Sequence, residues 1–189
     1  NAGHILGAAV VELWLTENGR TRKIAFSGDL GYRDAPVMPD ADTIGEADLV
    51  LLESTYGDRL HRPFTSTLEE LASVFAAARQ AGGNVIIPAF AVGRTQDLLY
   101  LLAEHYEDWG LGNFRVYLDS PMAIEATETY AQFRHLYQSE LFRPGTREVR
   151  LPNLTMSRRS DESMAINRVH SGAVVIAGSG MCSGGRVLH

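Results

Sequence analysis

The sequence predicts an α/β protein in which a short β-rich segment precedes a parallel sheet flanked by helices. Two runs typical of strands, residues 8–15 and 22–27, flank a Glu-Asn-Gly turn that favours a hairpin. After Gly57 the rhythm changes, and short apolar runs alternate with helical ones. Continuous apolar strands that alternate with helices are typical of a parallel sheet. The boundary between the two parts is expected near residues 58–65.

The segments next to these runs fit the same plan. Residues 48–53 form a short apolar run that ends in a carboxylate and suits a buried strand. Ser66 and Glu69 have the spacing of a capping box, which predicts a long helix that ends at Gly82. The apolar residues of this helix share one face: Leu68, Leu71, Ala72, Phe75 and Ala78.

The remaining elements alternate along the chain. Further strands are expected at 84–88, 114–118 and 173–177, and helices from about residue 95, over 123–137 and over 160–168. The polar segment 138–160 is expected to be a loop. Its arginines are either a solvated face or a contact to a nucleic-acid backbone: Arg143, Arg147, Arg150, Arg158 and Arg159.

Composition bounds the function. The formal charge of −6 excludes a strongly basic protein that wraps nucleic acid, but a local groove or bound metal ions can still supply a positive field. The single cysteine, Cys182, excludes an internal disulfide and favours the cytoplasm. No run approaches the roughly 20 apolar residues of a membrane helix, so no membrane contact is expected. The chain starts at Asn1 rather than at methionine, and we expect native residues before it.

Two segments carry residues of the type that bind metals. His4 lies between glycines just before a strand, and Asp29 follows twenty-five residues later at a strand end, also between glycines. Imidazole and carboxylate are zinc-type ligands, and a carboxylate can bridge the two metals of a phosphodiester hydrolase. From these two residues alone, the favoured interpretation is that His4 is a loop histidine and Asp29 a turn former.

A third polar segment follows the run 48–53. Glu53 is succeeded by two hydroxyl residues and Tyr56. A carboxylate at this position can orient a histidine or tune a proton donor, or it can simply cap a turn.

Three further loops follow the three apolar strands of the second part. They contain Gly93 and Arg94, then Asp119 and Ser120, and last Ser179 and Gly180. In open parallel sheets, ligands bind at the carboxyl ends of the strands. Backbone N–H groups at a helix start and the fork of an arginine suit phosphate. Each loop alone is what any strand–helix turn requires, but their recurrence favours an anion-binding cleft.

Six motifs carry a resemblance to a known family: GHILGA, SGDLG, LLESTYGDR, IPAFAVGRTQDLL, DSPMA and GSGMCSGGR. Their order and spacing resemble the β-CASP subgroup of the metallo-β-lactamase superfamily, which includes RNA-processing nucleases and the endonuclease of pre-mRNA cleavage and polyadenylation. The resemblance covers nearly the whole chain. It implies that residues 1–60 are part of a metallo-β-lactamase sandwich and that 61–189 are a β-CASP domain, incomplete at its C-terminal end.

The resemblance also implies roles for individual residues. His4 is similar to a metal-ligand histidine, and Asp29 to the catalytic carboxylate that bridges two zinc ions. Glu53 is similar to the acidic catalytic residue that pairs with a later histidine. The implied chemistry is hydrolysis of RNA, as an endonuclease or 5′-exonuclease, by a two-metal hydroxide mechanism. Substrate contacts are implied at positions from both parts of the chain: Tyr56, Gly93, Arg94, Asp119, Ser120, Ser179 and Gly180.

The sequence departs from the family pattern in its metal motif. The His-x-His-x-Asp-His segment is absent and is expected before residue 1, and two later histidines are expected after residue 189. This chain alone is therefore expected to be poor in zinc and inactive. RNA is the expected partner, while single-stranded DNA and a homodimer are left open. The alternatives are a non-catalytic module that binds RNA or a partner, and a Rossmann-like nucleotide-binding domain, whose G-x-G-x-x-G is missing.

Overall fold

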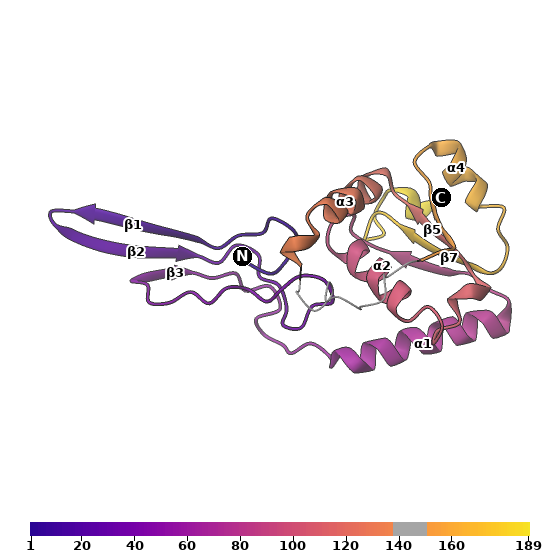
Figure 1. Ribbon diagram of the computed structural model, residues 1–189, viewed down its shortest axis with the longest axis horizontal. Helices are drawn as coiled ribbons and strands as arrows, with labels where there is room; N and C mark the ends of the chain where they lie inside the picture. Colours follow the sequence, from indigo (N-terminus) through magenta and orange to yellow (C-terminus); the bar gives the residue numbers. More distant parts are fainter. Residues whose placement is uncertain (138–150) are drawn as a thin grey trace. The chain divides into compact units, whose positions relative to one another are not determined.

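The structure is a computed structural model that describes residues 1–137 and 151–189 (Figure 1). The chain divides into two compact units. The first contains residues 1–61 and, among the described residues, 135–137; the second contains residues 62–134 and 151–189. We describe each unit by itself.

The first unit is built on a three-stranded sheet in the order β1-β2-β3. Strand β1 (Val11–Glu17) pairs antiparallel with β2 (Arg20–Phe26), and β2 pairs parallel with β3 (Leu49–Leu51). Asn18 and Gly19 both have positive φ, 51° and 74°, which the tight turn of a two-residue hairpin requires. The predicted hairpin is confirmed; its first strand lies two to three residues later than expected, and its second strand one to two residues earlier.

The third strand differs from the prediction in its burial. Leu49, Val50 and Leu51 are all exposed, although their apolar run suggested a buried strand. The strand is at the edge of a small sheet, and most side chains of the neighbouring strands are exposed as well. An apolar run indicates that a strand tends to be buried, but few of the described residues pack over β3.

The second unit contains a four-stranded parallel sheet in the order β4-β7-β5-β6. The strands are β4 (Val85–Pro88), β5 (Arg115–Asp119), β6 (Leu154–Met156) and β7 (Ala173–Ala177). The predicted α/β fold with a parallel sheet is confirmed. The expected loop at 138–160 is wrong in its described part, because β6 pairs along β5. Asn153 fixes this strand by donating to the carbonyl oxygens of Leu111 and Phe114. Residues 138–150 lie outside the described part.

Four α-helices belong to the described part of this unit. They are α1 (Phe64–Ala81), α2 (Arg94–Glu104), α3 (Pro121–Gln132) and α4 (Ser160–Ile166), with short 3-10 turns at Leu111–Asn113 and Arg186–Leu188. A further 3-10 turn, Arg134–Leu136, replaces the last part of the helix expected over 123–137. No described helix combines the length and the apolar character needed to cross a membrane.

The ends of α1 show one failed and one successful prediction. The expected capping box of Ser66 and Glu69 does not form, because the helix starts at Phe64 after Pro63 and Ser66 is already within its first turn. The C-terminal end is as expected, since Gly82 takes the left-handed conformation, with φ of 63°, and its N–H bonds to the last turn.

The core lies on one face of the parallel sheet. Val85, Val174 and Val116 are neighbours across three strands and are buried there. Phe75 of α1 packs in the same cluster and stacks on Trp109, with 5.5 Å between ring centres. The predicted apolar face of α1 packs in or against this cluster and is confirmed: Leu68, Leu71, Ala72, Phe75 and Ala78.

The opposite face of the sheet is more open. Ile86 of β4 and Val175 of β7 line a pocket of about 230 Å³ there, together with Ser163 and Ile166 of α4. Helices therefore flank the sheet on both faces, with only the short α4 on this side of the described part.

Candidate functional site

The loops of the two predicted metal ligands are in backbone contact within the first unit. The N–H of Gly31, two residues after Asp29, donates to the carbonyl of Ala2, with 2.8 Å between N and O. A side chain on Gly31 has no room, because a Cβ atom there would lie 1.9 Å from the carbonyl oxygen of Gly3 and 2.9 Å from the nitrogen of His4. Both His4 and Asp29 are exposed. The structure thus brings the loops of these residues together and leaves their side chains accessible.

Glu53 braces the Asp29 loop. One oxygen of its carboxylate accepts the N–H of Leu30 at 2.7 Å, and the other accepts the N–H of Thr55 at 3.1 Å. Its own N–H donates to the Oγ of the buried Ser27, which in turn donates to the carbonyl of Gly28. By accepting two backbone N–H groups, the Glu53 carboxylate fixes the loop that contains Leu30 and the turn that contains Thr55.

The pKa of Glu53 is lowered by these contacts. The hydrogen bond from the Leu30 N–H is the main cause, those from Thr55 add to it, and the nearby His4 contributes by its charge. All of these favour the ionised carboxylate. Glu53 is therefore an anion held in place beside the Asp29 loop.

We expect acidification to release this brace. Because the folded-state pKa of Glu53 is lowered, its contribution to stability is complete above the pKa of the unfolded chain and is lost as the pH falls through the folded-state value. The amide proton of Leu30, followed by NMR, should titrate in that acidic window. The inflection should vanish in Glu53→Gln, which cannot titrate. A Leu30 amide that titrates unchanged in this variant would contradict the assignment.

The described residues do not complete a metal centre by themselves. Within residues 1–137 and 151–189, no group of three histidine, cysteine, aspartate or glutamate side chains is placed to hold an ion. The donor types of His4 and Asp29 suit zinc. Their exposure and adjacent loops fit a role as two members of a larger ligand set.

Tyr56 belongs to the same unit as Glu53. Its backbone has a positive φ of 56°, and its side chain is exposed. The ring meets His61 edge-on, with 5.1 Å between ring centres, and Arg59 lies over it. The ring is accessible to a ligand, as its predicted substrate contact requires.

The loops of the second unit meet at the carboxyl edge of the parallel sheet. They follow β4, β7 and β5, which are neighbours in the sheet. A Cβ atom on Gly180 would lie 2.9 Å from the nitrogen of Phe90, and one on Gly178 would lie 3.7 Å from the Oγ of Ser120. The predicted convergence of these loops is thus observed, with the loop after β7 between the other two.

Gly93 and Arg94 start α2 at this edge. The N–H of Gly93 donates to the buried Gln96 at 2.7 Å, and Gln96 also donates to the carbonyl of Ala91 and to Thr127 Oγ1 of α3. Gln96 therefore fixes the loop before α2 and ties it to α3. Arg94 is exposed, and among the described residues its charge has a single, loose ion pair, 3.9 Å long, with Asp97.

Ser120 and Ser179 place hydroxyl groups at the same edge. Ser120 caps α3 by accepting the N–H of Ala123 at 3.3 Å. The Oγ of Ser179 is buried and has no hydrogen-bond partner among the described residues. A buried hydroxyl without a partner is costly unless a ligand or water satisfies it.

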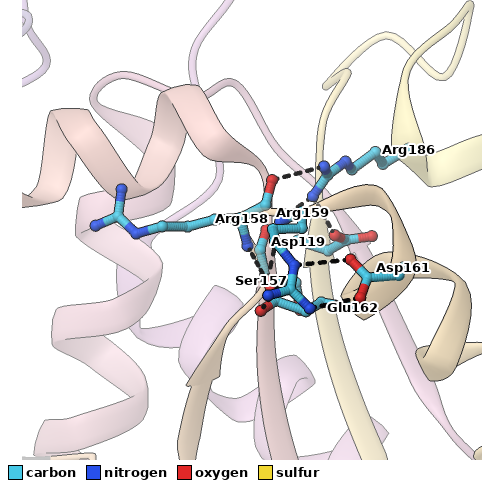
Figure 2. A network of polar contacts seen from close by, with 7 residues as sticks. All are labelled: Asp119, Ser157, Arg158, Arg159, Asp161, Glu162 and Arg186. Carbon is cyan, nitrogen blue, oxygen red and sulfur yellow. Dashed lines mark hydrogen bonds and ion pairs between the residues drawn. The ribbon is translucent and has the colours of Figure 1, made fainter.

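Asp119 is the centre of a network that joins three segments (Figure 2). The carboxylate is only 4% exposed. It accepts the hydroxyl of Ser163 at 2.7 Å and Nη1 of Arg186 at 2.8 Å. Arg186 also donates to the carbonyl oxygens of Ser157 and Arg158. Because both carboxylate oxygens have protein partners, the geometry gives Asp119 a role in holding the loop after β7, and a direct contact with substrate would require this network to open.

The predicted basic stretch is only partly described. Arg158 pairs with Glu128, and Arg159 pairs with Asp161. Their charges are therefore already matched by neighbouring carboxylates. Arg143, Arg147 and Arg150 lie outside the described residues.

Sequence reasoning missed three residues that position the candidate site. Ser27 and Gln96 lie in the recognised motifs SGDLG and IPAFAVGRTQDLL, but neither was given a role. Gln96 stands at the third position of a helix, where a glutamine can bond back to the helix start. Arg186 was part of a recognised motif, but its partner Asp119 lies 67 residues away along the chain. Long-range pairs of this kind are not visible in local patterns.

Together, these features define a class of protein: an α/β protein with anion-type loops at the end of a parallel sheet, preceded by a segment that brings an imidazole and a carboxylate loop together. The family model of the Beta-Casp domain matches residues 95–189. The chain belongs to the β-CASP family of metallo-β-lactamase-type proteins, as its motifs indicated.

Curated relatives extend the likeness to the whole chain. A ribonuclease of Thermus thermophilus is 40% identical over all of this chain and 43% of its own length. An RNase J-like protein of Methanocaldococcus jannaschii is 33% identical over the same shares of the two chains. The transcription termination factor FttA of the same archaeon is 30% identical over 98% of this chain and 30% of its own length. The chain thus spans less than half the length of these relatives.

Proposed function

We propose that these residues belong to a zinc-dependent ribonuclease and that His4 and Asp29 are two of its metal ligands. The observation that carries the proposal is the backbone contact between the loops of these two residues, which Gly31 permits. Membership of a family with ribonuclease relatives supports the reaction class. The proposal includes the assignment of residues 1–60 to a metallo-β-lactamase domain and of 61–189 to a β-CASP domain, and a location in the cytoplasm.

The residues of the first unit divide the work between ligation and positioning. When bound, zinc activates water and offsets the charge that develops on the phosphate. Asp29 presents an exposed carboxylate and His4 an exposed imidazole. Glu53 keeps the Asp29 loop in place through the Leu30 N–H. We assign Asp29 to catalysis as a metal ligand, and Glu53 to catalysis through its hold on the Asp29 loop. We assign Tyr56 to substrate contact.

The carboxyl edge of the parallel sheet is proposed to contact RNA. Arg94 offers an exposed guanidinium, and the Ser179 hydroxyl lacks a hydrogen-bond partner within residues 1–137 and 151–189. Ser120 and Gly180 lie on the neighbouring loops, and Gly93 starts α2, where helix N–H groups favour phosphate. Asp119 holds the loop after β7 in place through its ion pair with Arg186.

The first test removes the proposed ligands in the full-length protein. We expect Asp29→Asn and His4→Ala to lower zinc content and to slow RNA hydrolysis by roughly 100-fold or more, because ligand positions are not replaceable by neutral amides or methyl groups. Zinc is measured by elemental analysis and hydrolysis with a labelled RNA. Glu46→Gln, an exposed position in the same unit, is the matched control and should change neither.

The same measurement applied to the 189-residue chain tests the incomplete ligand set. We expect less than one zinc ion per chain and no RNA cleavage, since two ligands do not hold two ions. Stoichiometric zinc together with cleavage would overturn this expectation. Unchanged zinc in the full-length Asp29→Asn variant would overturn the ligand assignment itself.

A second candidate is a non-catalytic module that binds RNA or a partner protein. The similarity to a transcription termination factor favours it, because that relative is named for a role other than cleavage. In this case the full-length protein would retain RNA binding and lack hydrolysis even with zinc present. Single-stranded DNA is a further candidate ligand, which competition against RNA would test. A homodimer is a further candidate assembly, which sedimentation would test.

A further inference from the structure

Phe90 is an aromatic residue held at the carboxyl edge of the sheet with its side chain in solvent. It lies just after β4 and is 55% exposed. Its backbone is fixed on both sides: the preceding Ala89 donates to the carbonyl of Ala177, and the buried Thr95 donates to the carbonyl of Phe90 at 2.7 Å. The exposure is therefore a property of an ordered loop.

Gly180 supports the ring from behind. A Cβ atom on Gly180 would lie 3.0 and 3.1 Å from Cδ2 and Cγ of Phe90. The ring thus packs closely against the backbone of the loop after β7, and only a glycine leaves room for it. This packing covers part of the ring and leaves the remainder to solvent.

Two exposed apolar side chains follow the neighbouring strands, one in the first turn of α3 and one in the loop after β7. Met122, just after Ser120, is 65% exposed, and Met181, next to Gly180, is 71% exposed. Methionine side chains adapt to flat apolar ligands of varied shape. Arg94, four residues after Phe90, adds an exposed guanidinium. An exposed aromatic ring and a cation on neighbouring loops are the features with which proteins bind single-stranded nucleic acids.

The size of this surface decides between a base and a protein partner. A stable protein interface buries about 1,200–2,000 Å². One ring and two methionines supply a small fraction of that, but they match the face of one or two bases. A base paired in a duplex does not expose its face, so the surface suits an unpaired strand.

We propose that Phe90 stacks on an unpaired nucleobase of the RNA strand that the carboxyl edge of the sheet contacts. The inference rests on the proposed function, since it assumes that RNA reaches this edge. It adds a specific contact: an unpaired base held by stacking at Phe90, beside a phosphate held at Arg94.

The test measures binding of a short fluorescent single-stranded RNA to the full chain. We expect Phe90→Leu, which keeps an apolar side chain, to raise the dissociation constant about tenfold, and Phe90→Trp to keep or lower it. Phe133→Leu removes another exposed ring, at the end of α3, and should have no effect. Thermal unfolding of each variant checks that the fold is retained.

An abasic oligonucleotide of the same length separates this inference from the proposed function. If Phe90 stacks on a base, the abasic strand binds wild type and Phe90→Leu alike, and more weakly than RNA binds wild type. If wild type binds RNA and Phe90→Leu binds it equally well, the stacking is wrong and the proposed RNA contact stands. If wild type binds neither strand, both the stacking and the proposed RNA contact are overturned.

Discussion

Replacing Asp119 with alanine is expected to destabilise the second unit by about 3–5 kcal/mol. The Asp119 carboxylate is almost fully buried. Arg186, with 19% of its side chain exposed, would lose its ion-pair partner within the described part of the chain. A charge left without its partner in a partly buried place is costly. The loss of the Ser163 hydrogen bond adds to the effect. Urea unfolding, followed by circular dichroism, measures the change.

The control for this prediction is a second aspartate–arginine pair close by. Asp161 pairs with Arg159 (Figure 2), and both side chains are more than half exposed. Exposed pairs contribute little to stability, so Asp161→Ala should leave the unfolding midpoint almost unchanged. The double variant Asp119→Ala with Arg186→Met should cost less than the sum of its single changes, because the two side chains act on each other. Equal effects of Asp119→Ala and Asp161→Ala would show that the buried network is not a stabilising element.

Replacing Gly31 with alanine is the second change with a large expected effect. The added Cβ would lie 1.9 Å from the Gly3 carbonyl oxygen, a contact that only movement of the backbone can relieve. We expect the first loop to move away, with the loss of the hydrogen bond from Gly31 to Ala2 and a cost of about 3 kcal/mol. Hydrogen exchange over residues 1–8 and 27–31 should rise, since these segments hold each other.

Gly45→Ala is the matched control for Gly31→Ala. Gly45 lies in the same unit, has no atom within 4 Å of an added Cβ and does not have a positive φ. This variant should be neutral or slightly stabilising, because alanine reduces the freedom of the unfolded chain. In the full-length protein, Gly31→Ala should also lower zinc content, while Gly45→Ala should not. Similar behaviour of the two variants would exclude the contact between the His4 and Asp29 loops as a determinant of the site.

The parts of the fold that could be predicted depend on local chemistry. The hairpin follows from two residues, Asn18 and Gly19, that accept positive φ. The parallel sheet follows from apolar runs alternating with helices, and the end of α1 follows from Gly82. In each case the residues that determine the structure are neighbours in the sequence.

The parts that could not be predicted depend on distant neighbours. Strand β6 exists because the edge of β5 is available to it, and its three residues carry no strand signal of their own. The exposure of β3 depends on what covers the sheet, which an apolar run does not reveal. The start of α1 at Phe64 shows that a capping pattern can be overridden within one turn.

The candidate site shows the same division. The convergence of the loops at Gly93, Ser120 and Ser179 could be predicted, because they follow strands of one parallel sheet. The exposed Phe90 and its backing by Gly180 could not, since the sequence shows only an aromatic residue in one loop and a glycine in another. The engagement of Asp119 by Arg186 likewise depends on the tertiary fold.

The exposed sheet of the first unit has a consequence for protein synthesis. Residues 1–61 are synthesised before the second unit. Exposed Leu13, Trp14 and Leu15 lie on β1, and β1 and β3 are the two outer strands of the sheet formed by the described residues. Exposed apolar strands with free edges associate with other chains and are bound by chaperones. The second unit has a hydrophobic core formed by its own residues. Of the two units described, the first is therefore the one that most needs protection during translation.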